Sequence, residues 1–488
     1  MSKKRMVGLR RDRYAVDMVE THVRPYAALA LAASSAIGFL EGLDSMPLNA
    51  AVEPAVVRRR LDRPLPEWGI PAEAAVDTLV RNVRDCLIGS QSGRFFAWVI
   101  GGSLPAALAA DWLTSAWGQN AALYDCSPAA AAIEELAGIW LKELLGLPQE
   151  ASFAFATGCQ MAHVTALAAA RHALLRDRGW DVEARGLFGA PQIHIVGSNR
   201  HHASIVRAIR MLGFGTQSFT ALEPTSDETL DPNALAGALA QLPEAPTIVL
   251  LQAGDINTGA FDSCPELIAI AKRHRAWVHV DGAFGLFAAA CARYRHLTAG
   301  MDKADSWATD GHKWLNVPFD VGYAFVRDAD AHRAAMTVAA PYIRAGQTVR
   351  DEIDWNPEWS RRARGFSTYA ALLQLGRRGV DELIERTCRY ARAIVDALGS
   401  LPGVEVVWRP IINQGLVRFL DSRPGATAAD HDRRTEAVTA AVASDGEAFF
   451  AASTWRGKRV MRVSVVNWRT SEDDVERTIA AVARRLAG

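Results

Sequence analysis

Lys313 is the residue of this sequence whose surroundings most favour covalent chemistry. It stands between His312 and Trp314, just after a short strand-like run. Most lysines lie at the surface of a protein, in water. A lysine held in a site can instead lose its proton and attack a carbonyl carbon, which forms a Schiff base. The alternative interpretation, an ordinary surface lysine in a loop, stays open on this stretch alone.

A second stretch supplies a partner for that lysine. Residues 276–280 are typical of a buried strand, and the strand ends in Asp281 followed by Gly282. In α/β folds the chemistry lies at strand ends. An aspartate there could hold a proton on a pyridine nitrogen, which pyridoxal 5'-phosphate (PLP) requires beside its Schiff-base lysine. The alternative is that Asp281 caps the N-terminus of a helix.

Asp281 and Lys313 together resemble the pair found in fold-type I PLP enzymes. The run His312, Lys313 and Trp314 more narrowly resembles the group II amino-acid decarboxylases, the family of aromatic-amino-acid, glutamate and histidine decarboxylases. The resemblance covers about residues 53–488. It implies an α/β, aspartate-aminotransferase-like fold with a large, mainly parallel sheet domain and a smaller C-terminal α+β domain.

The resemblance also implies a reaction and an assembly. We expect α-decarboxylation of an L-amino acid, an aromatic one among the candidates, to an amine and carbon dioxide. We also expect a homodimer with shared active sites. The expected parts are an N-terminal helical segment at the dimer interface (1–125), a PLP-binding domain (126–375) and a small domain (376–488). Two alternatives remain: another PLP enzyme, such as a transaminase or aldehyde synthase, or a cofactor-free relative acting as an interaction protein.

A turn before a predicted helix at 164–175 is expected to bind the cofactor phosphate. It contains Gly158, Cys159 and Gln160. Free backbone N–H groups at a helix start, together with the helix dipole, favour an anion. The family has a second Gly and a Thr where this chain has Cys159 and Gln160. Backbone donors survive such changes, whereas a threonine hydroxyl contact would be lost.

Three further residues are expected beside the cofactor because of the resemblance. The family stacks a histidine on the pyridine ring, and spacing favours His202, with His201 as the second choice. The alternative is a pair of capping or surface histidines. Ala283 and His312 belong to the two best-matching motifs and are expected to contact the cofactor.

Substrate contacts and the proton donor also follow from the resemblance. Trp98 and Phe319 match aromatic residues that line the family's substrate site. Tyr342 lies in a predicted lid at 337–365, and long loops in compact domains are usually functional. A phenol there can donate a proton to the substrate Cα. The family's aldehyde synthases have Phe at this place, so Tyr342 favours an amine product unless it is an ordinary loop tyrosine.

The chain departs from the family at several positions. Asp310 stands where the family often has Asn near the phosphate, and an acid would repel the phosphate unless protonated or turned away. Asp255 and Ile256 replace two threonines. Asn120 and Ala122 stand where bulkier side chains would be expected, so the pocket looks less aromatic than in the aromatic-amino-acid enzymes.

Composition narrows the class of protein. The chain has 488 residues, half of them hydrophobic, and a formal net charge of zero. This gives no electrostatic case for binding nucleic acid or an anionic membrane. Its 6 cysteines are scattered without a Cys-x-x-Cys pair. They predict reduced thiols in a cytoplasmic protein, with neither disulfides nor a metal site.

The N-terminus could be mistaken for a signal peptide. Residues 1–13 are basic and residues 26–40 are mostly apolar. The apolar run starts late and is shorter than the roughly 20 residues that a membrane span needs. We therefore expect a helix that packs on another surface, such as a partner subunit.

Strand and helix patterns alternate from about residue 150 to 330, which favours a largely parallel sheet. The predicted elements there are strands at 191–197, 247–252 and 322–326, and helices from Pro232 and at 265–274. The predicted small domain has strands at 404–407, 415–420 and 460–466, and a closing helix at 472–486.

Overall fold

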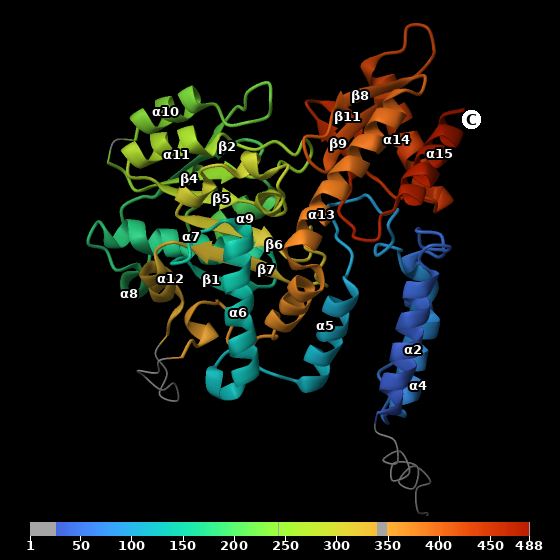
Figure 1. Cartoon of the computed structure of the whole chain (residues 1–488), viewed down its shortest axis with the longest axis horizontal. Coiled ribbons are helices and arrows are strands. Elements are labelled where there is room, and N and C mark those ends of the chain that lie inside the picture. The colour runs from blue at the N-terminus through green and yellow to red at the C-terminus, as the bar shows by residue number, and fades with distance from the viewer. Residues whose placement is uncertain (1–25, 243, 339–348, 488) are drawn as a thin grey trace, which may run out of the picture. The chain divides into compact units, whose positions relative to one another are not determined.

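The computed structural model describes residues 26–242, 244–338 and 349–487 (Figure 1). The chain divides into two compact units, Met1–Gly89 and Ser90–Gly488. The three-part division at residues 125 and 375 remains a prediction.

The first unit is helical. Its described elements are α2 (Ala27–Gly42), α3 (Pro54–Leu61), α4 (Ala72–Val83) and the 3-10 turn η2 (Arg84–Cys86). The predicted apolar helix is confirmed by α2, which packs against α4 (Figure 1). No residue of α2 is buried, and Leu29 and Ile37 are exposed. Across the described residues, every helix is too short or too polar to cross a membrane.

The second unit contains a seven-stranded sheet with strand order β1-β7-β6-β5-β4-β2-β3 (Figure 1). Only β7 runs antiparallel to its neighbours, and the other pairings are parallel. The strands are β1 (Ser152–Ala156), β2 (His194–Ser198), β3 (Phe219–Leu222), β4 (Thr247–Gln252), β5 (Trp277–Asp281), β6 (Ser306–Asp310) and β7 (Gly322–Val326).

Helices and 3-10 turns surround this sheet. They are α5 (Pro105–Trp117), η3 (Tyr124–Cys126), α6 (Pro128–Leu145), α7 (Cys159–Arg176), α8 (Val182–Arg185), α9 (Ala203–Met211), η4 (Thr216–Ser218), α10 (Pro232–Ala240), α11 (Cys264–Arg273), η5 (Gly285–Ala290), η6 (Arg295–Thr298), η7 (Met301–Lys303), α12 (Ala329–Met336) and η8 (Glu352–Asp354).

Alternation along the strands builds a core on each face of the sheet. Successive side chains of a strand point to opposite faces. On β4, Val249 and Leu251 belong to a core with residues of α6, α10 and α11. Ile248 and Leu250 belong to a second core with residues of α7, α9 and α12. A sheet covered on both faces explains why the strands are almost continuously apolar.

The C-terminal part of the second unit has its own sheet, with strand order β10-β11-β9-β8 and antiparallel pairing throughout. Its elements are α13 (Gly365–Gly399), β8 (Val404–Trp408), β9 (Gln414–Phe419), α14 (Ala428–Asp445), β10 (Ala451–Trp455), β11 (Lys458–Ser464) and α15 (Glu472–Ala487). A third core joins α13, α14 and α15 to these strands. Helix α13 kinks at Gly376, which has φ of 58°.

Most of the predicted elements are confirmed, and three strands were missed. The predicted strands at 247–252 and 322–326 have the bounds of β4 and β7. The predicted helix from Pro232 is α10, and Asp231 caps it because its side chain accepts the Asn233 N–H. The missed strands are β1, β3 and β10. They are only 4 or 5 residues long and contain several Ala, Ser and Thr residues, so their hydrophobic pattern is weak.

Candidate active site

Two neighbouring parallel strands end at the two acids singled out in the sequence. Strand β5 ends at Asp281 and β6 ends at Asp310. The Gly282 N–H donates to the Ala308 carbonyl at 2.9 Å, and the Asp310 N–H donates to the Ala283 carbonyl at 2.9 Å. The carboxyl ends of the strands therefore form one edge, where ligands of α/β sheets bind.

Gly322 brings the predicted phosphate turn to the same edge. At the start of β7, Gly322 pairs with Ala156 on one side and with Asp310 on the other. The turn after Ala156 leads into α7, which begins at Cys159. A Cβ on Gly322 would lie 2.5 Å from the Gly158 Cα, so only glycine allows this approach.

Lys313 lies at this edge, three residues after the end of β6. Its Nζ is 3.1 Å from Oδ2 of Asp310, and 20% of its side-chain surface is exposed. Burial alone would lower the pKa of Lys313, but the adjacent Asp310 carboxylate outweighs burial and raises the pKa above its ordinary value. The structure thus places the lysine beside an acid and within reach of a ligand.

Asp310 also occupies the phosphate turn. Its Oδ1 accepts the Cys159 backbone N–H at 2.5 Å and lies 3.5 Å from Nε2 of His312. A Cβ on Gly158 would come within 3.4 Å of the same oxygen. The acid is therefore not turned away from the turn. It accepts a bond from an N–H group that the turn would offer to a phosphate.

Asp281 is buried and directed toward three partners. Its Oδ1 accepts the Ala283 N–H at 3.1 Å, and its Oδ2 lies 3.5 Å from Nε2 of His163. The Cys159 thiol lies 4.0 Å from Oδ1. Asp281 caps no helix, because the following 3-10 turn η5 has Phe284 at its N-cap. A carboxylate in this position suits a protonated ring nitrogen.

The charges of this edge act on His202. His202 precedes α9 and caps it, with Nδ1 2.8 Å from the Ser204 hydroxyl. Its pKa is lowered, mainly by partial burial, and the charges of Asp281 and Lys313 act on it as well. His201 instead packs its ring 4.6 Å from that of Phe219. His202 therefore caps α9 and also lies near the site. Its stacking on the cofactor ring remains a prediction.

The two predicted substrate aromatics lie on segments next to Lys313. Phe319 is 57% exposed, and its ring centroid is 4.6 Å from that of His312. Trp98 is 51% exposed and packs against Phe449. Its loop runs against the lysine, because a Cβ on Gly101 would clash with the Lys313 carbonyl. Both aromatics therefore have free surface near the lysine.

Three further residues considered from the sequence form hydrogen bonds within the chain. Gln160 donates from Nε2 to the Ser204 carbonyl at 3.2 Å. Asp255 closes a turn by accepting from the Asn257 and Thr258 N–H groups at 2.8 Å each. The Asn120 side chain accepts the Arg361 N–H at 3.1 Å. Asp255 and Asn120, two of the positions that depart from the family, thus have structural partners within the chain.

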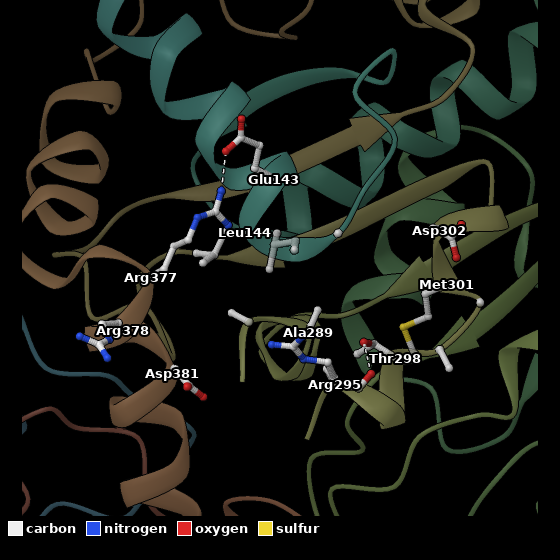
Figure 2. Close-up of a pocket in the computed structure, with 15 residues that line it drawn as sticks. Glu143, Leu144, Ala289, Arg295, Thr298, Met301, Asp302, Arg377, Arg378 and Asp381 are labelled. Carbon is white, nitrogen blue, oxygen red and sulfur yellow. Dashed lines mark hydrogen bonds and ion pairs between the residues drawn. The ribbon is translucent and has the colours of Figure 1, made fainter. Parts of the chain in front are cut away.

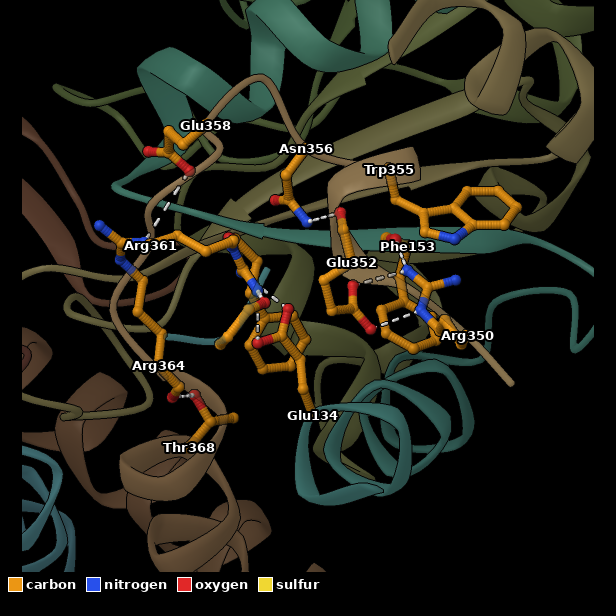
Figure 3. A network of polar contacts seen from close by, with 12 residues as sticks. Glu134, Phe153, Arg350, Glu352, Trp355, Asn356, Glu358, Arg361, Arg364 and Thr368 are labelled. Atoms are coloured by element: carbon orange, nitrogen blue, oxygen red, sulfur yellow. Dashed lines mark hydrogen bonds and ion pairs between the residues drawn. The ribbon is translucent and has the colours of Figure 1, made fainter. Parts of the chain in front are cut away.

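Tyr342 lies outside the described residues. The chain that follows that segment is fixed to the free edge of β1 by two arginines (Figure 3). Arg350 donates to the Phe153 carbonyl at 2.5 Å, and Arg361 donates to the Phe155 carbonyl at 2.7 Å. Arg361 also forms a bidentate pair with buried Glu134, at 2.8 and 3.0 Å. The residues after position 348 are therefore anchored at the strand that leads into the phosphate turn.

The residues present fit PLP. Lys313 offers an amine, Asp281 offers a buried carboxylate, and the start of α7 at Cys159 offers backbone donors. Ala283 is a small side chain that packs in the same cluster as Cys159. The one feature against the fit is the Asp310 carboxylate on the phosphate turn. Its two oxygens contact different groups, because Oδ2 lies 3.1 Å from Nζ of Lys313 while Oδ1 accepts the Cys159 N–H.

The Cys159 thiol, His163 imidazole and Asp281 carboxylate lie close enough together to be considered as metal ligands. Burial raises the pKa of the Cys159 thiol well above its ordinary value, helped by the nearby carboxylates. In the metal-free protein the thiol is therefore protonated. The cluster includes Asp281, at the edge where the ring of the cofactor is expected.

A separate surface cavity of about 500 Å³ lies elsewhere in the second unit (Figure 2). It is lined by charged residues that include Glu143, Arg295, Arg377 and Asp381. Arg377 and Glu143 pair with each other at 2.5 Å. None of the residues predicted for the active site lines it.

The sequence matches the model of the pyridoxal-dependent decarboxylase conserved domain over residues 54–420. The chain belongs to this family. It is 26% identical over 446 residues to the aromatic-L-amino-acid decarboxylase of Bacillus atrophaeus, covering 90% of each chain. PLP is thus the cofactor of the enzyme, and amino-acid decarboxylation is its class of reaction.

Two solved structures show the same fold. That of Oryza sativa TDC with PLP and tryptamine matches the enzyme with a TM-score of 0.87 at 24% identity, over 99% of each chain. The 4-hydroxyphenylacetaldehyde synthase of Rhodiola rosea matches with a TM-score of 0.82 at 20% identity, over 98% of this chain and 100% of that chain. The enzyme is therefore a fold-type I protein, as the sequence predicted.

Sequence reasoning missed the two histidines connected to Asp281. His279 lies two residues before Asp281 on β5, so both side chains point to the same face. His163 lies one turn after Cys159 on α7. Strand alternation and helix spacing could have drawn attention to both, but neither pattern shows that the two rings meet.

Proposed function

We propose that this enzyme removes the α-carboxyl group of an aromatic L-amino acid and releases the corresponding amine. The observation that carries the proposal is the meeting of Lys313, Asp281 and the start of α7 at one sheet edge. When bound, PLP supplies an electron sink for the electrons left at Cα after carbon dioxide departs. The residues of the chain hold the cofactor, orient the substrate and deliver a proton to Cα.

Each residue has a distinct role in the proposal. Lys313 holds the cofactor covalently and releases the amine. Asp281 keeps a proton on the ring nitrogen, because a buried carboxylate favours the protonated partner. His202 packs against the ring, and Tyr342 delivers a proton to Cα. The bond that breaks joins Cα to the carboxylate carbon, and its electron pair becomes the C–H bond made with the delivered proton.

Two observations favour an aromatic side chain on the substrate. Trp98 and Phe319 expose about half of their surface on segments that contact or flank Lys313. Aromatic rings gain from contact with each other beyond the area that they bury, by about 0.5–1.5 kcal/mol per pair. The relative in Bacillus atrophaeus is named for aromatic amino acids, and the rice structure contains tryptamine.

Carbon dioxide release from each standard amino acid tests the proposal. We expect purified, PLP-loaded enzyme to act on tryptophan, tyrosine or phenylalanine at least tenfold faster, in kcat/KM, than on glutamate or histidine. The Phe319→Ala variant should lose this preference more than it loses activity in general. A preference for an acidic or basic amino acid would overturn the aromatic assignment. Release of aldehyde in place of amine would favour the aldehyde synthase alternative.

We also propose a homodimer located in the cytoplasm. Leu29, Ile37 and Leu79 expose much of their apolar surface on α2 and α4, and a second copy would cover it. Ile37→Glu should then shift the sedimentation of the enzyme toward the monomer. Arg81→Ala, an exposed polar change on α4, should leave it unchanged. A wild-type protein that sediments as a monomer at micromolar concentration would refute the homodimer.

A further inference from the structure

Asp281 is connected to a row of buried polar side chains that crosses from α7 to β6. His163 Nε2 lies 3.5 Å from Asp281 Oδ2, and His163 Nδ1 lies 2.9 Å from His279 Nε2. His279 Nδ1 lies 2.9 Å from the Ser306 hydroxyl. The Trp277 indole N–H donates to the same hydroxyl at 2.8 Å. His163, His279 and Ser306 have no exposed surface, so every hydrogen bond of the row is protected from water.

Both imidazoles of the row are neutral near pH 7. Burial lowers the pKa of His163 to about 3 and that of His279 to about 3. A neutral imidazole has one N–H and one bare nitrogen. Each ring therefore donates on one side and accepts on the other, and the whole row has only two possible directions.

Trp277 selects one of the two directions. An indole N–H can only donate, so Ser306 accepts from Trp277 and has its own proton to give to His279 Nδ1. His279 then carries its proton on Nε2 and donates to His163 Nδ1. His163 in turn carries its proton on Nε2, the atom that faces Asp281. In the reverse direction, the Ser306 proton would have no acceptor in the row. His163 would also direct the lone pair of its Nε2 at the Asp281 carboxylate.

We infer that this row makes His163 a fixed N–H donor to Asp281 and so sets the strength with which Asp281 holds the proton of the cofactor's ring nitrogen. The inference rests on the proposed function. A donated hydrogen bond favours the ionised carboxylate, and an ionised Asp281 keeps the ring nitrogen protonated. His163 is thus a positioning residue that acts through Asp281. His279, Ser306 and Trp277 fix its tautomer.

Other groups around His163 do not reverse this assignment. The Cys159 sulfur lies 3.3 Å from His163 Nε2 and shares that N–H with Asp281 Oδ2, which lies at 3.5 Å. Burial raises the pKa of the thiol, and a protonated sulfur accepts a hydrogen bond more weakly than a carboxylate does. The other charged or titratable groups that act on His163 are Asp310, Lys313 and His202. These belong to the cofactor edge and remain unchanged in the variants below.

The tautomers can be measured directly. Nitrogen NMR of the full-length protein with ¹⁵N-labelled histidine, with and without PLP, should show Nδ1 unprotonated and Nε2 protonated in both rings. Loss of one set of signals in His163→Gln assigns His163. Ser306→Ala removes the donor to His279 Nδ1 and should produce a mixture of tautomers. A proton on Nδ1 of either ring in the parent protein would overturn the inference.

The effect on the cofactor has its own measurement. In His163→Leu, the pH at which the absorbance of bound PLP changes should shift by about one unit, and kcat should fall about tenfold. His163→Gln retains an N–H donor and should restore both to within about threefold. An unchanged absorbance titration in His163→Leu would refute the inference. If His163→Leu fails to fold, the absorbance titration of His163→Gln and the tautomers measured in the parent protein still test the inference.

Failure of the inference and failure of the proposed function give different results. If the protein releases carbon dioxide from amino acids while its tautomers are reversed, only the inference fails. If no amino acid is decarboxylated by PLP-loaded protein with the expected tautomers, the proposed function fails.

Discussion

The Asp310 carboxylate lies 3.1 Å from Nζ of Lys313 and, through its other oxygen, accepts the backbone N–H of Cys159. One side chain thus contacts both the amine proposed to bond the cofactor's aldehyde and the turn proposed to bind its phosphate. A carboxylate at this distance favours the ammonium form of the lysine, which agrees with the raised pKa of Lys313. Only the neutral amine attacks an aldehyde, so Asp310 opposes capture of the cofactor.

The first prediction is that Asp310→Asn binds PLP about tenfold more tightly than the parent enzyme. The change removes the negative charge that holds Lys313 protonated and that would repel the phosphate, and one pKa unit corresponds to about a factor of ten. An absorbance titration of cofactor-free protein with PLP measures the Kd. Asp320→Asn is the matched control, because exposed Asp320 pairs with Arg364 and should leave the Kd unchanged. Weaker binding in Asp310→Asn would mean that the carboxylate helps to hold the phosphate.

The second prediction concerns Asp281. Asp281→Asn should retain bound PLP but lose kcat by about 100-fold or more, because a neutral amide no longer favours a protonated ring nitrogen. Steady-state kinetics at saturating PLP, with cofactor content measured in the same sample, separates the rate from binding. If kcat stays at the parent level, the acid serves only to bind the Ala283 N–H.

The third prediction concerns the type of product and Tyr342. Tyr342→Phe cannot donate a proton to Cα, so amine formation should collapse. Oxygen can then react at the same carbon, and aldehyde, ammonia and peroxide should appear in place of the amine. Product analysis in air and under nitrogen distinguishes the two routes. Amine formed at the parent rate would show that another group is the proton donor.

The fourth prediction concerns stability and the buried Arg361–Glu134 pair (Figure 3). Burial raises the pKa of Glu134 to about 7 from its usual value of 4.5, although Arg361 opposes the rise. The folded protein thus binds this proton more tightly than the unfolded chain, and the group's contribution falls as pH rises from about 4.5 to 7. Arg361→Met removes the opposing charge, so its stability deficit should grow with pH.

Denaturant unfolding at pH 6 and pH 8 measures that deficit. We expect Arg361→Met to lose about 3 kcal/mol at pH 8 and less at pH 6. The control is Arg377→Met, whose partner Glu143 also lies on α6 but in an exposed pair. It should lose less than about 1 kcal/mol at both values. Equal deficits for the two variants would show that the buried pair contributes nothing beyond an exposed one.

The sequence predicted the parts of the site that depend on strand ends. Asp281 and Asp310 each end a strand, and parallel neighbours bring such ends together. That reasoning places residues at one edge but does not orient side chains. The contact of Asp310 with the Cys159 N–H depends on Gly322, which pairs with both flanking strands, and β1 was not predicted. The row from Trp277 to His163 joins side chains of three elements that are far apart in the sequence. No local sequence pattern predicts that these side chains contact one another.

The central claim is that Lys313 carries the cofactor, and reductive trapping tests it most directly. Borohydride reduction of the PLP-loaded enzyme, followed by proteolysis and mass spectrometry, identifies the lysine bonded to the pyridoxyl group. We predict the label on Lys313 alone, with no label in Lys313→Ala. The informative competitor is Lys142, whose pKa burial lowers and whose Nζ donates to the Ala151 carbonyl at 2.9 Å. A label on Lys142, or full turnover by Lys313→Ala without added amine, would contradict the account.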